Sequence, residues 1–267
     1  MICLAAQPQA AAMVTDLQGR ASIQNGALAE TLVLTAEAGS NCPITLDPGA
    51  RIVLVSYATG EEITATGPAR FTLDAKGHPA GPGRGIQVTP AKGLRLQESL
   101  KPGGLAQASL VMRDAGPAEL ALRSPLDRVV ADARPRFAWE DLGTGAQYRF
   151  RLQGPGGQHL FAAEPAAPQA DLPPGLRLQE GVAYVWAVSA TLPDGTVRKA
   201  QADLALLGRA ARIRLAALRS HAPESFSHQV AYAAALQEAG LLDQAKPRWR
   251  ALQALRPDDP TLAAYAK

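Results

Sequence analysis

Large apolar residues stand at every second position in three short runs of the sequence: Pro135-Arg136-Phe137-Ala138-Trp139, Tyr148-Arg149-Phe150-Arg151-Leu152 and Tyr184-Val185-Trp186-Ala187-Val188. In a β-strand this alternation turns all the large side chains to one face. We expect such faces to close over one another in a β-sandwich that serves as a binding or spacer module. The aromatic residues expected in its core are Trp139, Tyr148, Phe150, Tyr184 and Trp186. A platform for stacking on carbohydrate is the alternative use of these side chains.

The sandwich is expected to span residues 118–207. Gly154-Pro155-Gly156-Gly157 is a hairpin-turn signal, and Leu178-Gln179-Glu180-Gly181 precedes the last aromatic run. Together with the Pro135-x-Phe137-x-Trp139 pattern, these motifs resemble a bacterial fibronectin type III-like domain. The resemblance implies that Trp139 and Trp186 are core residues of facing sheets. It also implies that Tyr184 lies near the position of the family's corner tyrosine.

Short strands separated by turn sequences fill the region before the sandwich, residues 14–111. Asp47-Pro48-Gly49 and Thr59-Gly60-Glu61-Glu62 are turn signals, and Gly67-Pro68 interrupts the chain again. Strands at this spacing predict an all-β sandwich or roll. The expected strands are residues 31–34, 44–46, 51–55, 63–66 and 70–73, followed by a loop at residues 78–85.

The same region resembles the periplasmic domain of FecR-type proteins over residues 13–112. The matching motifs follow one another in order: Val14-Thr15-Asp16-Leu17-Gln18-Gly19-Arg20-Ala21, Ala38-Gly39-Ser40, Leu46-Asp47-Pro48-Gly49-Ala50-Arg51-Ile52 and Thr66-Gly67-Pro68-Ala69-Arg70-Phe71. The resemblance implies an extracytoplasmic β module. FecR proteins also carry a membrane span and a cytoplasmic anti-sigma segment, and we identify neither here, which weighs against a signalling role.

The hydrophobic period becomes helical after Leu207, and residues 208–267 form the expected helical tail. Helices are expected at residues 209–218, 226–239 and 241–255, with Gly240 as a C-cap. Pro247 is tolerated only near the first turn of a helix, so the third helix is expected to start near Ala245. The run from Ala234 to Pro257 resembles one tetratricopeptide repeat.

A single repeat of this kind cannot bury its own apolar face. The tail is therefore expected to dock on the sandwich, to pack with the helix at 209–218, or to contact a protein partner. The residues expected on its apolar faces are Leu236, Leu241, Leu242, Trp249, Leu252 and Leu255.

The chain of 267 residues is long enough for two or three domains. Its net charge of +3 is small for this length and does not indicate a nucleic-acid-binding surface. No stretch reaches the roughly 18 apolar residues of a membrane-spanning helix. Of the two cysteines, Cys3 lies in a segment that we expect to be removed, so Cys42 is expected to be unpaired.

Ala10-x-Ala12 has the small-residue form of a signal-peptidase site, although only a short apolar stub without a basic residue precedes it. Two interpretations remain. Residues 1–12 are the remnant of a longer signal peptide that is cleaved after Ala12, or they are a flexible terminus of a cytosolic protein. We expect export, and therefore a periplasmic or secreted protein.

The residues able to carry chemistry predict no catalytic, cofactor or metal site. The histidines, His78, His159, His221 and His228, lack a second ligand at metal spacing and are expected to be exposed or satisfied by ordinary contacts. The adjacent carboxylates Glu61-Glu62 and Asp258-Asp259 lie in turns, and neighbours in a strand point to opposite faces. Cys42 precedes a proline and lacks an evident base, and Gly83-Arg84-Gly85 lacks the Lys and helix of a phosphate loop.

The sequence thus predicts a mainly β protein with two consecutive β-sandwich or β-roll domains and a short α-helical C-terminal hairpin. We expect a non-catalytic adaptor or binding module of the cell envelope that contacts a protein or a glycan. The alternatives are a component of a FecR-type sensory system and an accessory module of polysaccharide processing.

Overall fold

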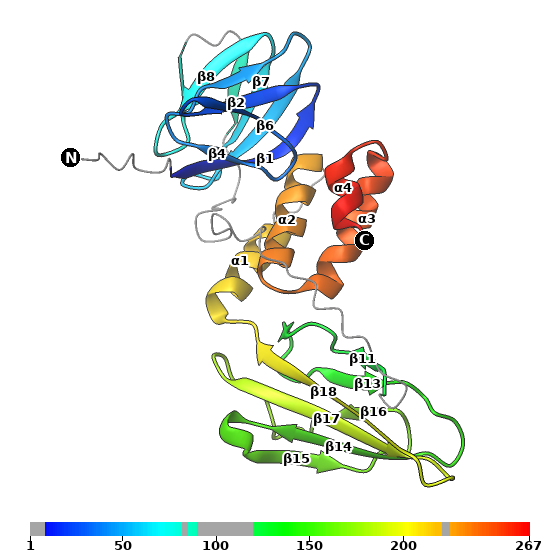
Figure 1. Cartoon of the computed structure of the whole chain (residues 1–267). Helices are drawn as coiled ribbons and strands as arrows, with labels where there is room; N and C mark the ends of the chain where they lie inside the picture. The colour runs from blue at the N-terminus through cyan, green and yellow to red at the C-terminus, as the bar shows by residue number, and fades with distance from the viewer. Residues whose placement is uncertain (1–8, 82–84, 90–119, 221–224) are drawn as a thin grey trace, which may run out of the picture. The chain divides into compact units, whose positions relative to one another are not determined.

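The computed structural model describes residues 9–81, 85–89, 120–220 and 225–267 (Figure 1). Strands dominate, and helices follow them at the C-terminal end, so the expected mainly β fold class is confirmed. The chain divides into two compact units. The composite unit joins the β region up to residue 89 with residues 213–238 and 244–267, and the sandwich unit holds residues 120–212 with 239–243.

The β region of the composite unit has two five-stranded sheets around one apolar core. Neighbouring strands in both sheets are antiparallel. The first sheet has the order β10 (Ile86–Thr89), β7 (Glu62–Thr66), β6 (Arg51–Ser56), β1 (Ala10–Gln18) and β4 (Glu37–Gly39). The second has the order β3 (Leu28–Thr31), β2 (Ala21–Asn25), β5 (Ile44–Leu46), β8 (Ala69–Leu73) and β9 (Pro79–Ala80).

Most expected strands of this region are present, and three details are corrected. The strand expected at 31–34 lies earlier, at Leu28–Thr31. Leu32 and Leu34 are buried in the connection that follows it, where the Leu32 N–H donates to the carbonyl oxygen of Ala21. Pro79 and Ala80 pair with β8 inside the expected loop. The boundary expected between Ala12 and Met13 falls inside β1, where Ala12 is fully buried and pairs with Ser56.

Strands β1 and β6 are buried on both faces. Val14 and Leu54 point into the core between the two sheets, whereas Val53 and Val55 are buried on the opposite side of the first sheet. A β-bulge interrupts the pairing of β1 with β6 at Thr15, so that Asp16 pairs with Val53. Such a bulge re-aims side chains, and here the consecutive residues Thr15 and Asp16 contact Ser227 of α2 and Arg256, the residue after α3.

The sandwich unit has a three-stranded and a five-stranded sheet that enclose a second core. Trp139, Tyr148, Phe150, Tyr184 and Trp186 are all buried in that core, as expected from the sequence. The smaller sheet has the order β11 (Leu122–Ser124), β13 (Arg136–Trp139) and β16 (Gln169–Asp171). The larger has the order β12 (Val129–Val130), β18 (Val197–Leu206), β17 (Ala183–Thr191), β14 (Gln147–Gln153) and β15 (His159–Ala163).

Aromatic side chains from both sheets meet at the centre of the sandwich. The ring of Phe137 lies 4.8 Å from that of Phe150 and 5.2 Å from that of Trp186, measured between ring centroids. The Tyr184 hydroxyl accepts a hydrogen bond from the backbone N–H of Gln179, at 2.8 Å. The Tyr148 hydroxyl accepts a similar bond from the backbone N–H of Leu142, at 2.8 Å.

The described C-terminal region contains four helices, so the expected hairpin is an incomplete description. They are α1 (Arg209–Ser220), α2 (Phe226–Glu238), α3 (Leu242–Leu255) and α4 (Pro260–Tyr265). Gly240 has φ 77° between α2 and α3, as expected for a C-cap. Helix α3 starts at Leu242 and continues through Pro247, so the later start near Ala245 is wrong. Helix α4 was not expected; Asp259 caps it by accepting from Thr261 N and Leu262 N.

Candidate functional site

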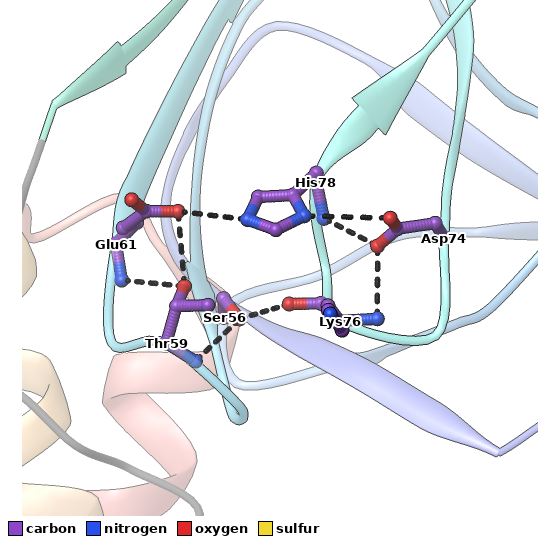
Figure 2. Close-up of polar contacts among 6 residues, drawn as sticks. All are labelled: Ser56, Thr59, Glu61, Asp74, Lys76 and His78. Carbon is purple, nitrogen blue, oxygen red and sulfur yellow. Dashed lines mark hydrogen bonds and ion pairs between the residues drawn. The ribbon is translucent and has the colours of Figure 1, made fainter.

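A histidine lies between two carboxylates on the β region of the composite unit (Figure 2). His78 Nε2 lies 3.4 Å from Glu61 Oε2, and His78 Nδ1 lies 3.3 Å from Asp74 Oδ2. Glu61 comes from the connection between β6 and β7, and Asp74 and His78 from the connection between β8 and β9. The cluster is open to solvent, since the side chains of His78 and Asp74 are 46% and 47% exposed.

Hydrogen bonds from neighbouring residues hold both carboxylates of this cluster in place. Asp74 Oδ1 accepts hydrogen bonds from the backbone N–H groups of Lys76 and His78, both at 2.8 Å. The N–H of His78, then that of Lys76 and the His78 ring, hold the pKa of Asp74 below its usual range. Glu61 Oε2 accepts from Thr59 Oγ1 at 3.1 Å.

The arrangement supports ionic bridging between two loops and does not form a nucleophile–base pair. When His78 is protonated, its two ring nitrogens become donors to one carboxylate on each loop. The nearby Ser56 hydroxyl is buried and donates to the carbonyl oxygen of Lys76 at 2.8 Å. This geometry commits the hydroxyl to a structural bond and leaves it without the alignment that general-base activation needs.

A second polar cluster connects β1 to the helices. The hydroxyl oxygens of Thr15 and Ser227 lie 2.6 Å apart, and Ser227 Oγ lies 3.1 Å from Glu62 Oε1. The Ser227 hydroxyl donates to Glu62, and Thr15 Oγ1 also lies 3.3 Å from the carbonyl oxygen of Val53. Because that carbonyl only accepts, the one hydroxyl proton of Thr15 is directed to Val53 or to Ser227. Thr15 and Ser227 are buried, so this contact lies inside the composite unit.

Asp16 forms the charged part of this cluster, which we call the β1–helix seam: Thr15, Asp16, Arg51, Glu62, Ser227 and Arg256. Its side chain is 8% exposed and receives Arg51 Nη1 on Oδ2 at 3.0 Å and Arg256 Nη1 on Oδ1. The Arg256 guanidinium also lies 3.7 Å from the ring centroid of Phe226, the first residue of α2. An aromatic face next to the cation adds to the attraction, so Arg256 joins α2, α3 and β1.

Most of the expected apolar docking surface of the tail is covered within the chain. Leu236, Leu241, Trp249 and Leu252 are buried, whereas Leu242 and Leu255 are 37% and 64% exposed. Trp249 stacks on Tyr265 of α4, with centroids 4.7 Å apart, and the Tyr265 hydroxyl lies 3.0 Å from Thr35 Oγ1. The helices thus bury their apolar residues partly through contacts with the N-terminal β region, a possibility that the sequence patterns did not indicate.

The other described residues considered as possible catalytic or metal-binding groups take part in ordinary contacts or lie exposed. Buried His228 Nε2 lies 2.9 Å from the carbonyl oxygen of Leu218, and His159 is exposed on β15. Burial raises the pKa of the Cys42 thiol, which keeps it protonated and a poor nucleophile. Glu61 and Glu62 have different partners, His78 and Ser227, as expected for neighbours with opposite directions. His221, Gly83 and Arg84 lie outside the described residues.

The solvent side of the larger sandwich sheet carries two adjacent cross-strand rows with cations. One row is Arg149–Ser189–Lys199, and the next is Arg151–Ala187–Gln201. The arginines lie on β14 and Lys199 lies on β18, and all three are exposed. We call the surface formed by these two rows the β17 face.

Within the described ranges, no group of three or more His, Cys, Asp or Glu residues is arranged to hold a metal ion. None of the helices in the described part of the chain combines the length and apolar character needed to cross a membrane.

Comparisons with known proteins do not assign the chain to a family. No protein-family model matches it, and no curated protein matches it either. Among solved structures, it is similar to the crystal structure of CopC from Methylosinus trichosporium OB3b, with 14% sequence identity. The match covers 33% of this chain and 93% of that chain, with a TM-score of 0.25.

Proposed function

We propose that this chain is a non-catalytic binding module, or adaptor, of the bacterial cell envelope that contacts a protein or a glycan. The observation that carries the proposal is the β1–helix seam. Through it the two ends of the described chain belong to one composite unit, and the sandwich is inserted between them. In the order of the chain, the sandwich is therefore preceded and followed by parts of the same unit.

The polar chemistry of the composite unit supports a structural use. Hydrogen bonds and ion pairs between segments far apart in the sequence engage the side chains of Ser227, Asp16 and Arg256. The Ser56 hydroxyl donates to a backbone carbonyl oxygen. A support held together by buried polar contacts suits a protein that positions a binding surface more than one that turns over a substrate.

We further propose that the three parts are a FecR-like domain, a fibronectin type III-like sandwich and a tetratricopeptide-like helical region. The corner-type bond of Tyr184 and the facing aromatic residues Trp139 and Trp186 support the second of these. The Gly240 turn between α2 and α3 supports the third.

The proposed location is the periplasm or the outer surface of the cell. The burial of Ala11 and Ala12 in β1 argues against processing after Ala12, because that cut would remove residues that pair with β4 and β6. If a leader is removed, we therefore expect the cut to fall before Ala10.

Fractionation of native cells tests the proposal. The full chain should appear outside the cytoplasm, sediment with isolated envelope fragments and begin at or before Ala10 by intact-mass measurement. A control variant with Arg123→Glu, an exposed change on β11, should be retained equally. Recovery of the protein only from the cytosol, with no retention on envelope fragments, would remove the basis of the proposal.

A further inference from the structure

The β17 face has an excess of positive charge that its surroundings do not neutralise. Arg149 pairs with Glu164 at 3.0 Å, whereas Arg151 and Lys199 form no ion pair with any described residue. On the smaller sheet, by contrast, Arg136 pairs with Asp171 at 3.1 Å. The two rows and their edge thus hold three cations and one carboxylate. The adjoining row adds Asp203, which pairs with Arg128 at 3.5 Å and leaves the positive excess unchanged.

The strand geometry places these cations on both sides of β17. Neighbouring strands lie about 4.8 Å apart, so the β14 and β18 columns are separated by about 10 Å. Between them, β17 presents Ala187 and Ser189, which are too short to reach across. The sequence sets this pattern, because Arg149 and Arg151 of β14 and Lys199 of β18 occupy outward positions while β17 presents Ala187 and Ser189 between them.

We propose that the β17 face binds an acidic polysaccharide, through ion pairs of its carboxylate groups with Arg149, Arg151 and Lys199. This inference rests on the proposed envelope-binding function and names its ligand class and site. Arginine recognises carboxylates with two parallel hydrogen bonds, and cations about 10 Å apart allow one extended chain to lie along β17 between them.

The chemistry of the face distinguishes an acidic glycan from a neutral one. Neutral sugars are held mainly by stacking on exposed aromatic rings, and the outward positions of β14, β17 and β18 carry none. The aromatic residues of these strands are Tyr148, Phe150, Tyr184 and Trp186, and all four are buried in the core. Charge is therefore the feature through which this face recognises a polymer.

The position of the face in the sheet favours a glycan over an acidic peptide. Extended peptides gain affinity by adding a strand to a free sheet edge. Strand β17 is central, with β14 paired along one side and β18 along the other, so its backbone groups are already used. A peptide on this face would contact it through side chains alone.

Binding of the full chain to defined polymers tests the proposal. The acidic probe is polygalacturonate, and its methyl-esterified form is the neutral match. Poly-glutamate is the acidic peptide. We expect binding to polygalacturonate that weakens as salt is raised from about 50 mM to about 500 mM, because screening shortens the range of exposed charges. We expect the methyl-esterified polymer not to bind.

Charge reversal at the face supplies the matched variants. Arg151→Glu with Lys199→Glu should weaken polygalacturonate binding by at least roughly tenfold, since two attractive contacts become repulsive. The single change Arg123→Glu on the other sheet should leave it within about twofold, because it alters charge away from the face. Thermal unfolding confirms that each variant is folded, and Arg151→Gln with Lys199→Gln replaces the reversed pair if that pair fails to fold.

Three results would overturn the proposal: no binding to polygalacturonate, equal loss in the Arg123→Glu control, or binding to poly-glutamate as tight as to polygalacturonate. Retention of the full chain on envelope fragments from its native cells distinguishes failure of the proposed ligand class from failure of the proposed adaptor function. A chain that binds envelope but not polygalacturonate keeps the adaptor function and loses this ligand class. A chain that binds neither loses both.

Discussion

The hydroxyl oxygens of Thr15 in β1 and Ser227 in α2 lie 2.6 Å apart, although 212 residues separate them in the sequence. Both side chains are buried, and Ser227 continues the contact to Glu62 of β7. Nearby, Asp16 binds Arg256 from beyond α3. These contacts make the C-terminal helices part of the unit that contains the N-terminal sheets, and they leave the sandwich as an insertion.

The carboxylate of Asp16 should be a main source of stability for the composite unit. Asp16→Asn removes the charge that Arg51 and Arg256 share, in a site where the Asp16 side chain is 8% exposed. Loss of one partner from a buried ion pair costs about 3–5 kcal/mol, and partial exposure of the arginines reduces the expected loss here to about 2–3 kcal/mol.

Chemical denaturation measures this loss as a change in the free energy of unfolding. The matched control is Asp171→Asn, which breaks the exposed pair with Arg136 and should cost less than about 1 kcal/mol. Equal effects of the two changes would mean that the seam does not hold the helices to β1.

The sandwich core should depend strongly on Trp186. This residue is fully buried next to Phe137 and Phe150, so Trp186→Ala leaves a large cavity. The expected cost is about 3–5 kcal/mol. Val185→Ala, at the outward-facing neighbour, should cost well under half of that. Thermal and denaturant unfolding compare the two, and a Trp186→Ala variant as stable as the parent chain would refute the core assignment.

Asp74 should make the stability of the composite unit depend on pH. Its pKa is lowered in the folded chain, mainly by the backbone N–H of His78. A carboxyl with a lowered folded pKa adds stability above its ordinary pKa, near 3.8, and loses that contribution as the pH falls through the lowered value. Asp74→Asn should therefore lower the unfolding temperature at pH 7, and the difference from the parent should shrink in acid.

Unfolding temperatures of the parent and of Asp74→Asn, measured from pH 7 downward, check this expectation. The protonated aspartic acid and the asparagine side chain are both uncharged, which is why the two curves should converge. A difference that is constant with pH would show that the charge of Asp74 has no part in it.

The sandwich was predictable because each of its key strands has one buried and one exposed face. Apolar residues therefore recur at every second position, as in Tyr184-Val185-Trp186. This period identifies both the strand and the side chains that point inward. The turn at Gly154-Pro155-Gly156-Gly157 could be predicted from its residue types, which suit a hairpin.

The seam was not predictable from periodicity, because β1 contains a bulge. Strict alternation would turn Thr15 and Asp16 to opposite faces, whereas the extra residue brings both into contact with the helical region. One signal was available. The run Ile52-Val53-Leu54-Val55 is continuously apolar, and such a run is typical of a strand that is covered on both faces.

Of the two contacts that His78 makes with carboxylates, only the one with Asp74 could be predicted from the sequence. Asp74 followed by Lys76 and His78 suits a turn in which the carboxylate accepts from nearby backbone N–H groups, which predicts that Asp74 lies beside His78. The approach of Glu61 depends on how the connections of two different sheets meet, and nothing local in the sequence encodes that distance.

A cross-link between positions 15 and 227 tests most directly the claim that the two ends of the chain form one unit. Thr15→Cys with Ser227→Cys, in a chain with Cys3→Ser and Cys42→Ala, replaces hydroxyls 2.6 Å apart by thiols that can form a bond of about 2.0 Å. Thr45→Cys with Ser227→Cys is the control, because Thr45 is exposed on β5 of the other sheet. Mild oxidation of the native protein should give an intrachain disulfide, seen as faster migration on a non-reducing gel, in the 15/227 variant alone. A 15/227 variant that migrates like the control, or links only between molecules, would contradict the account.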